Sequence, residues 1–372
     1  MCVLLAFSWQ ALKVRSEFGG NWTGLFDTGK AFPPPPELAR ENILVVSETT
    51  GYDGQFYHYV AHDPFLRRGL TRYVDNPRLR YSRILVPMMA YLLSAGHQDW
   101  VDRSFRLVIL LFVGLGAWWM TRFALKHRWR KDSALLFVLF PAAILSVETL
   151  TVDVALMALC VGFLLFQDEQ EPAWKLAAIL VLAPLVRETG AILTAAATLS
   201  ALRTRRWRRA LLFAGTIAPW LAWISFLYLH TDSHPYAISP IPFSETWLAL
   251  LHVRSAVQGP IGSLLTALDR LAILGSALAI VLGLFQIRRP DAVALACAGF
   301  GVLGLLLQRG DVWLNYHAHT RVLSPLYLWL AMESTPLPPL LARLPLILVT
   351  PRYLLQVLPQ LPLFIRSVRP NM

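Results

Sequence analysis

The stretch FRLVILLFVGLGAWWMTRFA (residues 105–124) is as long as a helix must be to cross a bilayer, about 20 residues for about 30 Å of hydrocarbon. The whole composition agrees with it, since 56% of the 372 residues are hydrophobic and only 15% are charged. A single globular core this apolar would leave too few polar side chains to cover it, so most apolar side chains are expected to face lipid. The composition excludes a disordered protein, a disulfide scaffold and a coiled coil, and it disfavours a soluble enzyme.

Further apolar runs along the chain indicate a helical bundle. Several are shorter than a full span, and such short helices are expected to pack inside a bundle around a water-filled cavity. The predicted fold is therefore all-α, a polytopic transmembrane helical bundle of about ten spans. The runs are 133–147, 151–166, 174–186, 191–202, 210–229, 271–285, 292–307 and 322–332.

The chain divides into four parts. Residues 1–12 are apolar but short, and we expect a first transmembrane helix that begins upstream of Met1, with a short signal-like segment as the alternative. Residues 13–104 form a long outer segment, and residues 105–335 form the transmembrane bundle. Residues 336–372 form a Pro-rich, membrane-associated segment, and whether it crosses the membrane or lies in the interface stays open.

Basic clusters between the apolar runs orient the bundle, in a chain of formal net charge +11. Lysine and arginine are enriched in cytoplasmic loops. This rule places residues 13–103, 146–150, 187–190, 230–270 and 308–320 on the outer face. Contact of the largest cluster with phospholipid or RNA is the alternative, but simple topology accounts for it, and no nucleic-acid partner is expected. The clusters are Lys126, Arg128, Arg130 and Lys131; Arg203, Arg205, Arg206, Arg208 and Arg209; and Arg288 and Arg289.

The long outer segment carries a dense group of aromatic and charged residues. In GYDGQFYHYVAHDP (residues 51–64), Gly51 and Gly54 allow a tight turn, Asp53 can cap the helix that follows, and Pro64 ends that helix. The stretch RYSRILVPMMAYLLSAG (residues 80–96) is predicted to be an interfacial helix on the outer leaflet. Loops of this length tend to be functional.

Four short blocks in this order resemble a known family. They are GYDGQFYHYVAHDP, RYSRILVP (residues 80–87), LVRETG (residues 185–190) and RVLSP (residues 321–325). Together they resemble bacterial integral-membrane glycosyltransferases of the GT-C superfamily, which use polyprenyl-phosphate sugars and are related to the dolichyl-phosphate-mannose-dependent mannosyltransferases. The resemblance implies a GT-C-like fold whose catalytic carboxylate lies in the first outer loop, and Asp53 matches that position.

The same resemblance implies the reaction and its setting. A sugar moves from a polyprenyl-phosphate donor to a hydroxyl of a glycan or lipid acceptor, with inversion, during cell-envelope synthesis. The enzyme is expected as a multi-pass protein of the bacterial inner membrane with its site on the extracytoplasmic side. Asp53 has no second acidic residue beside it, so a divalent metal stays possible but no metal ligand is assigned.

The chemistry of these residues supports the same hypothesis independently. An ionised aspartate can accept the proton of an attacking hydroxyl, and arginine binds phosphate through paired donors. Asp53 is therefore the candidate base, and Glu48, Asp63 and Glu188 are the next outer-face carboxylates that could take this role. The expected donor-binding residues are Arg80, Arg83, Arg187, Glu188, Arg321, Gln55, Tyr57, Tyr316 and His317.

Each of these residues also has a structural interpretation. Asp53 can serve only as a helix cap. Arg80 and Arg83 can extend from an interfacial helix to lipid headgroups. Arg187 and Glu188 can pair with each other or with neighbouring helices as a structural lock.

His58 and His62 share a helix face at metal-ligand spacing, with Asp63 adjacent, but two histidines without a third well-placed ligand are more often packed on aromatic rings or solvated. For the whole chain, the alternative function is a polytopic transporter or flippase of a lipid-linked or anionic substrate. A non-catalytic assembly partner is a third. We find no inverted internal repeat, and the polar residues concentrate in one outer segment, which counts against a transporter.

Overall fold

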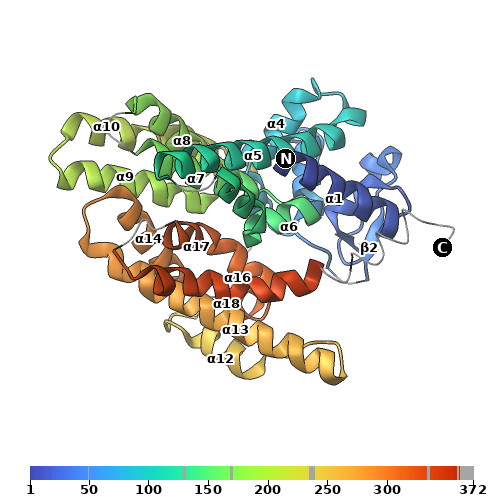
Figure 1. Cartoon of the computed structure of the whole chain (residues 1–372). Helices are drawn as coiled ribbons and strands as arrows, with labels where there is room; N and C mark the ends of the chain where they lie inside the picture. The colour runs from blue at the N-terminus through green and yellow to red at the C-terminus, as the bar shows by residue number, and fades with distance from the viewer. Residues whose placement is uncertain are drawn as a thin grey trace.

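The described part of the chain is mostly helical, and its helices form two stacked groups in the computed structural model (Figure 1). The structure describes residues 1–48, 50–128, 131–167, 171–233, 239–332, 336–357 and 360. The N-terminal group, blue to green in Figure 1, contains α1 (Cys2–Glu17), α2 (Gly54–His62), α3 (Pro77–Ser82), α4 (Leu85–Leu93), α5 (Gln98–Lys126), α6 (Pro141–Thr149), α7 (Asp153–Phe166), α8 (Ala173–Val186), α9 (Ala191–Arg203), α10 (Trp207–Gly215) and α11 (Ala218–His230).

The C-terminal group, yellow to red in Figure 1, packs below the first, with α14 against α9 and α16 against α6. It contains α12 (Ser244–His252), α13 (Gly259–Leu284), α14 (Ala292–Leu306), α15 (Gly310–Trp313), α16 (Tyr316–Val322), α17 (Ser324–Ala331) and α18 (Pro339–Val357). Short 3-10 helices join these elements: η1 (Trp22–Phe26), η2 (Pro36–Glu41), η3 (Leu70–Tyr73), η4 (Lys131–Leu139), η5 (Glu188–Gly190) and η6 (Phe285–Arg288).

Helix α7 is the centre of the core. All 14 of its residues are buried, and it packs against α5, α6, α8 and α17. A helix that is apolar on every side is stable only when neighbours surround it. This confirms, for α7, the expectation that the short apolar helices pack inside the bundle.

Within the described residues, three helices are long and apolar enough to cross a membrane: Gln98–Lys126, Trp207–His230 and Gly259–Arg288. The second of these is the most exposed, with only 22% of its apolar window buried inside the protein. Leu211 and Leu229 on it are 75% and 82% exposed. An exposed apolar surface of this size suits lipid. The larger number of about ten spans stays a prediction.

Several boundaries differ from those expected. Helix α1 continues to Glu17 instead of ending at residue 12, and α5 begins at Gln98 instead of residue 105. Helix α18 packs against α13, while residues 358–359 and 361–372 of the predicted C-terminal segment lie outside the described residues. The outer segment also contains a feature that an all-α fold does not include, a parallel pairing of β1 (Thr28–Gly29) with β2 (Val45–Ser47).

The single interfacial helix expected over residues 80–96 is wrong, because α3 and α4 are separate there. Arg83 has non-helical dihedral angles, φ −92° and ψ 52°. Pro87 lacks the N–H that would continue a helix from Arg83, and proline is tolerated only in a first helical turn, where α4 places it. The break between the two helices leaves Arg83 free to point away from both.

The bundle has two chemically different ends. Helices α9 and α14 connect basic clusters with the segments 187–190 and 308–320, and α8, which ends at the segment 187–190, begins beside Arg206 and Arg209. At the basic end, the Arg203 guanidinium donates to the carbonyls of Ile287 and Arg289 at 3.1 and 3.2 Å, which joins two of the predicted clusters. Arg130 of the first cluster lies outside the described residues. Segments 187–190 and 308–320, which the sequence assigns to one face, thus share one end of the bundle.

Candidate functional site

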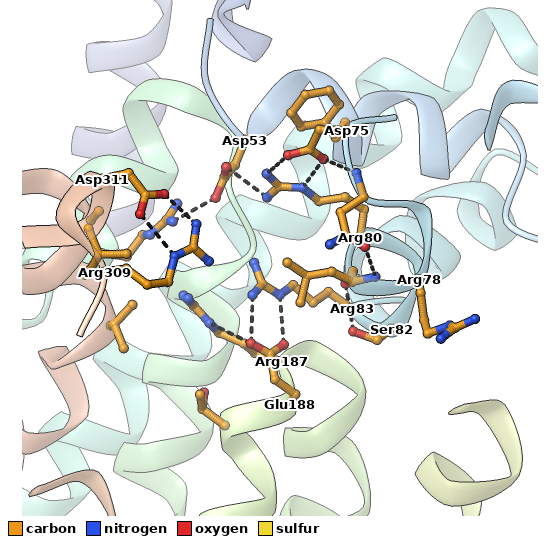
Figure 2. A pocket seen from close by; sticks show the side chains of 18 of the residues that line it. Asp53, Asp75, Arg78, Arg80, Ser82, Arg83, Arg187, Glu188, Arg309 and Asp311 are labelled. Carbon is orange, nitrogen blue, oxygen red and sulfur yellow. Dashed lines mark hydrogen bonds and ion pairs between the residues drawn. The ribbon is translucent and has the colours of Figure 1, made fainter. Parts of the chain in front are cut away.

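A cavity of about 730 Å³ opens at the end opposite the basic clusters. In Figure 2, Asp53, Arg80 and Arg83 converge on it from the outer segment, and Arg187 and Glu188 meet them from η5 and the residue before it. Among the described residues its lining holds six arginines and four carboxylates: Arg78, Arg80, Arg83, Arg187, Arg309 and Arg321, and Asp53, Asp75, Glu188 and Asp311.

Asp53 lies where the chain enters α2, and two glycines make that position possible. Gly51 has φ +66°, a conformation that favours glycine. A Cβ at Gly54 would lie 2.1 Å from the carbonyl oxygen of Thr149, so the first turn of α2 can approach the end of α6 only without a side chain there. The turn expected from the sequence is therefore confirmed, and its close packing fixes the direction of Asp53.

The Asp53 carboxylate forms no capping hydrogen bond with α2. Its Oδ1 lies 2.8 Å from Nη1 of Arg80, and its Oδ2 lies 2.7 Å from Nη2 of Arg321. The interpretation of Asp53 as only a helix cap is thus wrong, because both oxygens are directed to arginines from α3 and α16.

Arg80 connects two carboxylates at one wall of the cavity. Besides its contact with Asp53, its Nε and Nη2 donate to the two oxygens of Asp75 at 2.8 and 2.6 Å. Its guanidinium also lies 4.8 Å from the ring centre of Phe56, within cation–π range. Arg80 is buried, so it does not reach out to headgroups as the alternative interpretation required.

Arg83 makes the other paired contact. Its Nε and Nη2 donate to the two oxygens of Glu188 at 2.9 and 2.7 Å, and its Nη1 donates to the Tyr57 hydroxyl at 2.7 Å. All the charged donors of Arg83 face the protein, so snorkelling to headgroups is wrong for this residue too.

Arg187 pairs with a neighbouring helix, one of the two partners that the structural interpretation allowed. Its Nη1 donates to Oδ1 of Asp153, the first residue of α7, and both side chains are buried. Glu188 lies farther from it, at 3.8 Å. The buried lock therefore joins Arg187 to α7 and not chiefly to Glu188, because the extended backbone at Arg187 directs the two neighbouring side chains differently.

The arginines keep the carboxylates of Asp53 and Glu188 ionised. Burial alone would raise the pKa of Asp53, but the charges of Arg80 and Arg321 outweigh it and hold that pKa well below its usual range. Burial would likewise raise the pKa of the Glu188 carboxyl, but the charge of Arg83 outweighs it and lowers that pKa to about 2. Both side chains are therefore anions at neutral pH.

The lining is electropositive and partly apolar. Six arginines against four carboxylates leave an excess of positive charge, which Asp153 behind Arg187 reduces but does not remove. A second part of the lining is apolar, with Ile224 from α11 and Leu303 from α14. Helix α11 is part of Trp207–His230, the most exposed of the three long apolar helices. The cavity therefore has an apolar wall, built partly by a helix suited to face lipid, beside a charged wall.

Of the remaining predicted donor-binding residues, only Gln55 is among the residues that line the cavity. Gln55 lines the cavity, but its amide accepts from Gly29 N–H and donates to the Thr50 carbonyl. Tyr57 lies behind Arg83. Tyr316 and His317 are not among the lining residues. Their rings lie 5.5 and 5.8 Å from the ring of Tyr353 on α18, and the His317 ring also lies 6.2 Å from the ring of Tyr52, which lines the cavity. Donor binding by these two residues stays a prediction.

The structure adds three carboxylates that the sequence analysis missed: Asp75 and Asp311 in the lining, and Asp153 behind Arg187. Asp153 had a signal, since an ionisable residue at the start of an apolar helix is costly without a partner. Asp75 precedes Asn76 and Pro77, a pattern that indicates only a helix start. Of the other candidate bases, Glu48 pairs with exposed Lys30, and Asp63 accepts from the backbone N–H groups of a turn, which leaves only Glu188 in the cavity.

No family model matches the chain, and the searches of curated proteins and of solved structures find no match either.

Proposed function

We propose that the protein is a membrane glycosyltransferase of the GT-C type, which moves a sugar from a polyprenyl-phosphate donor to an acceptor hydroxyl. The observation that carries this proposal is the Asp53 carboxylate, held between Arg80 and Arg321 in a cavity that also has an apolar wall. An anionic lipid needs both kinds of wall, one for its phosphate and one for its chain.

The proposed donor binds with its phosphate toward the arginines and its prenyl chain along Ile224 and Leu303. A phosphate at Arg80 and Arg321 competes with Asp53 for their N–H donors. Losing these partners raises the affinity of the Asp53 carboxylate for a proton, because the same two charges keep its pKa low in the empty cavity. Donor binding would thus prepare the base.

In the proposed step the acceptor oxygen bonds to the anomeric carbon from the side opposite the phosphate. The bond from that carbon to the phosphate oxygen breaks, and polyprenyl phosphate leaves with both bonding electrons. Asp53 takes the hydroxyl proton and passes it to water when its arginines return. Arginines stabilise the leaving phosphate. The anomeric centre is inverted.

The donor test uses purified protein in lipid nanodiscs with polyprenyl phosphates that carry a radiolabelled hexose or pentose, and a lipid extract as acceptor. We expect one of these donors to release polyprenyl phosphate in step with label transfer. Loss of labelled donor without released polyprenyl phosphate, or no reaction with any donor, would contradict the proposal. In sealed proteoliposomes, movement of intact donor across the bilayer without cleavage would instead favour the transporter.

The proposed location is the bacterial inner membrane, with the cavity on the extracytoplasmic side. A periplasmic reporter fused after Ser233, which lines the cavity, should be active, and one fused after Arg205, at the basic end, should be silent. The physical reason is that positively charged loops stay in the cytoplasm. The reverse pattern of reporter activity would place Asp53 in the cytoplasm and remove the proposed access to outer-face acceptors.

A further inference from the structure

A second cluster of ionisable side chains lies outside the cavity, on the side of α2 that faces α5. His58 and His62 on α2 are fully buried, and Asp102 on α5 lies beside both. Oδ1 of Asp102 is 2.7 Å from Nε2 of His58 and 3.1 Å from Nε2 of His62. Asp102 is the third well-placed ligand that the sequence alone did not identify, and it lies 40 residues after His62.

Hydrogen bonds around His62 determine its tautomer. Arg68 donates to Oε1 of Gln98, while the amide nitrogen of Gln98 donates to the Gly96 carbonyl, so Oε1 is an acceptor. Nδ1 of His62 lies 2.7 Å from that oxygen and must therefore carry a proton. In the neutral ring, Nε2 then presents a lone pair to the Asp102 carboxylate, which is repulsive unless a proton or another cation lies between them.

His58 has the same need. Its Nε2 is close to Asp102, yet neither of its ring nitrogens has the geometry of a hydrogen bond, although the side chain is fully buried. Its ring is fixed by stacking on Phe26, with the ring centres 4.0 Å apart and an interplanar angle of 4°. A buried polar group without a hydrogen bond is costly. Two imidazoles and one carboxylate oxygen thus point at one small volume.

We propose that His58, His62 and Asp102 bind a divalent metal ion, with zinc as the best fit. Two histidines and one carboxylate are a common three-ligand zinc set that leaves a fourth position for water. One ion would accept the Nε2 lone pairs of both rings and the Asp102 oxygen. The donation from His62 Nδ1 to Gln98 is the outer hydrogen bond that metal-binding histidines usually make.

The position of this site gives it a structural task that is independent of the proposed reaction. It would join α2 to α5, and Asp53 immediately precedes α2. The three ligands are not part of the cavity lining, so the ion would hold the helix that carries Asp53 without touching the donor. His58 and His62 are positioning residues in this proposal.

The test measures metal in the full-length protein, purified with an affinity tag that contains no histidine and dialysed against excess zinc, then against metal-free buffer. We expect about one zinc per chain in the wild type, and loss of most of it in His58→Gln and in Asp102→Asn. His97→Gln, at an exposed histidine at the start of α5, is the matched control and should keep its zinc.

Cobalt provides a readout that needs no variant. Added Co²⁺ should give the visible absorption bands of a low-coordinate site in the wild type, and zinc should abolish them. The temperature of unfolding should rise with added zinc and fall with chelator. Wild-type protein without bound zinc or cobalt would overturn the proposal and assign a protonated His62 paired with Asp102. Equal zinc content in His58→Gln and wild type would overturn it as well.

Discussion

Replacing Asp53 by asparagine is expected to lower turnover by about 100-fold or more, the usual contribution of a positioned base. Asparagine keeps the shape of the side chain and can still accept a hydrogen bond from Arg80 or Arg321, but it cannot take the proton of the acceptor. The donor should still bind, because the arginines remain in the cavity. The measurement is the rate of polyprenyl phosphate release, together with donor affinity, on protein that elutes as a single folded species.

Glu48→Gln is the control for Asp53→Asn. Glu48 lies in the same outer segment but is exposed and pairs only with Lys30 among the contacts of the described residues. We expect its turnover to equal that of the wild type. An active Asp53→Asn enzyme would move the base to Glu188, the other outer carboxylate in the cavity that was a candidate from the sequence, and would break the link between Asp53 and the proposed family.

Asp153→Asn should lower the free energy of unfolding strongly. Asp153 and Arg187 form an ion pair whose side chains are 4% and 7% exposed, and Arg321 lies 3.6 Å from the other oxygen of Asp153. Removing the charge of Asp153 leaves Arg187 buried without its anion. Breaking a buried pair in this way costs about 3–5 kcal/mol of the free energy of unfolding. The measurement is the unfolding temperature in detergent.

A double variant separates the lost pair from a general packing defect. Arg187→Gln added to Asp153→Asn removes the uncompensated charge, so the double variant should be more stable than Asp153→Asn alone. Glu48→Gln should leave the unfolding temperature unchanged, since its pair with Lys30 is exposed. An unfolding temperature of Asp153→Asn equal to that of the wild type would show that the Arg187–Asp153 pair does not hold α7 in place.

The sequence predicted those features of the fold that depend on residues close together in the chain. Apolar runs predicted the helices, and the run that starts at Thr151 predicted the buried helix α7. The glycines at 51 and 54 predicted the turn that presents Asp53, because a left-handed residue and a close backbone approach both require glycine. Pro87 carried the information that separates α3 from α4, although the apolar run across it suggested one helix.

The sequence by itself also determined which residue types would meet phosphate and lipid, since arginines and apolar runs are visible without a structure. Only the tertiary structure decided which charges pair. Arg83 meets Glu188 across 105 residues, and Arg187 takes Asp153 instead of its neighbour. An ion pair depends on distances of a few ångströms between side chains, and helix packing sets those distances. For the same reason only the tertiary structure placed Tyr316 and His317 beside Tyr353 of α18, and His317 also beside Tyr52 of the cavity.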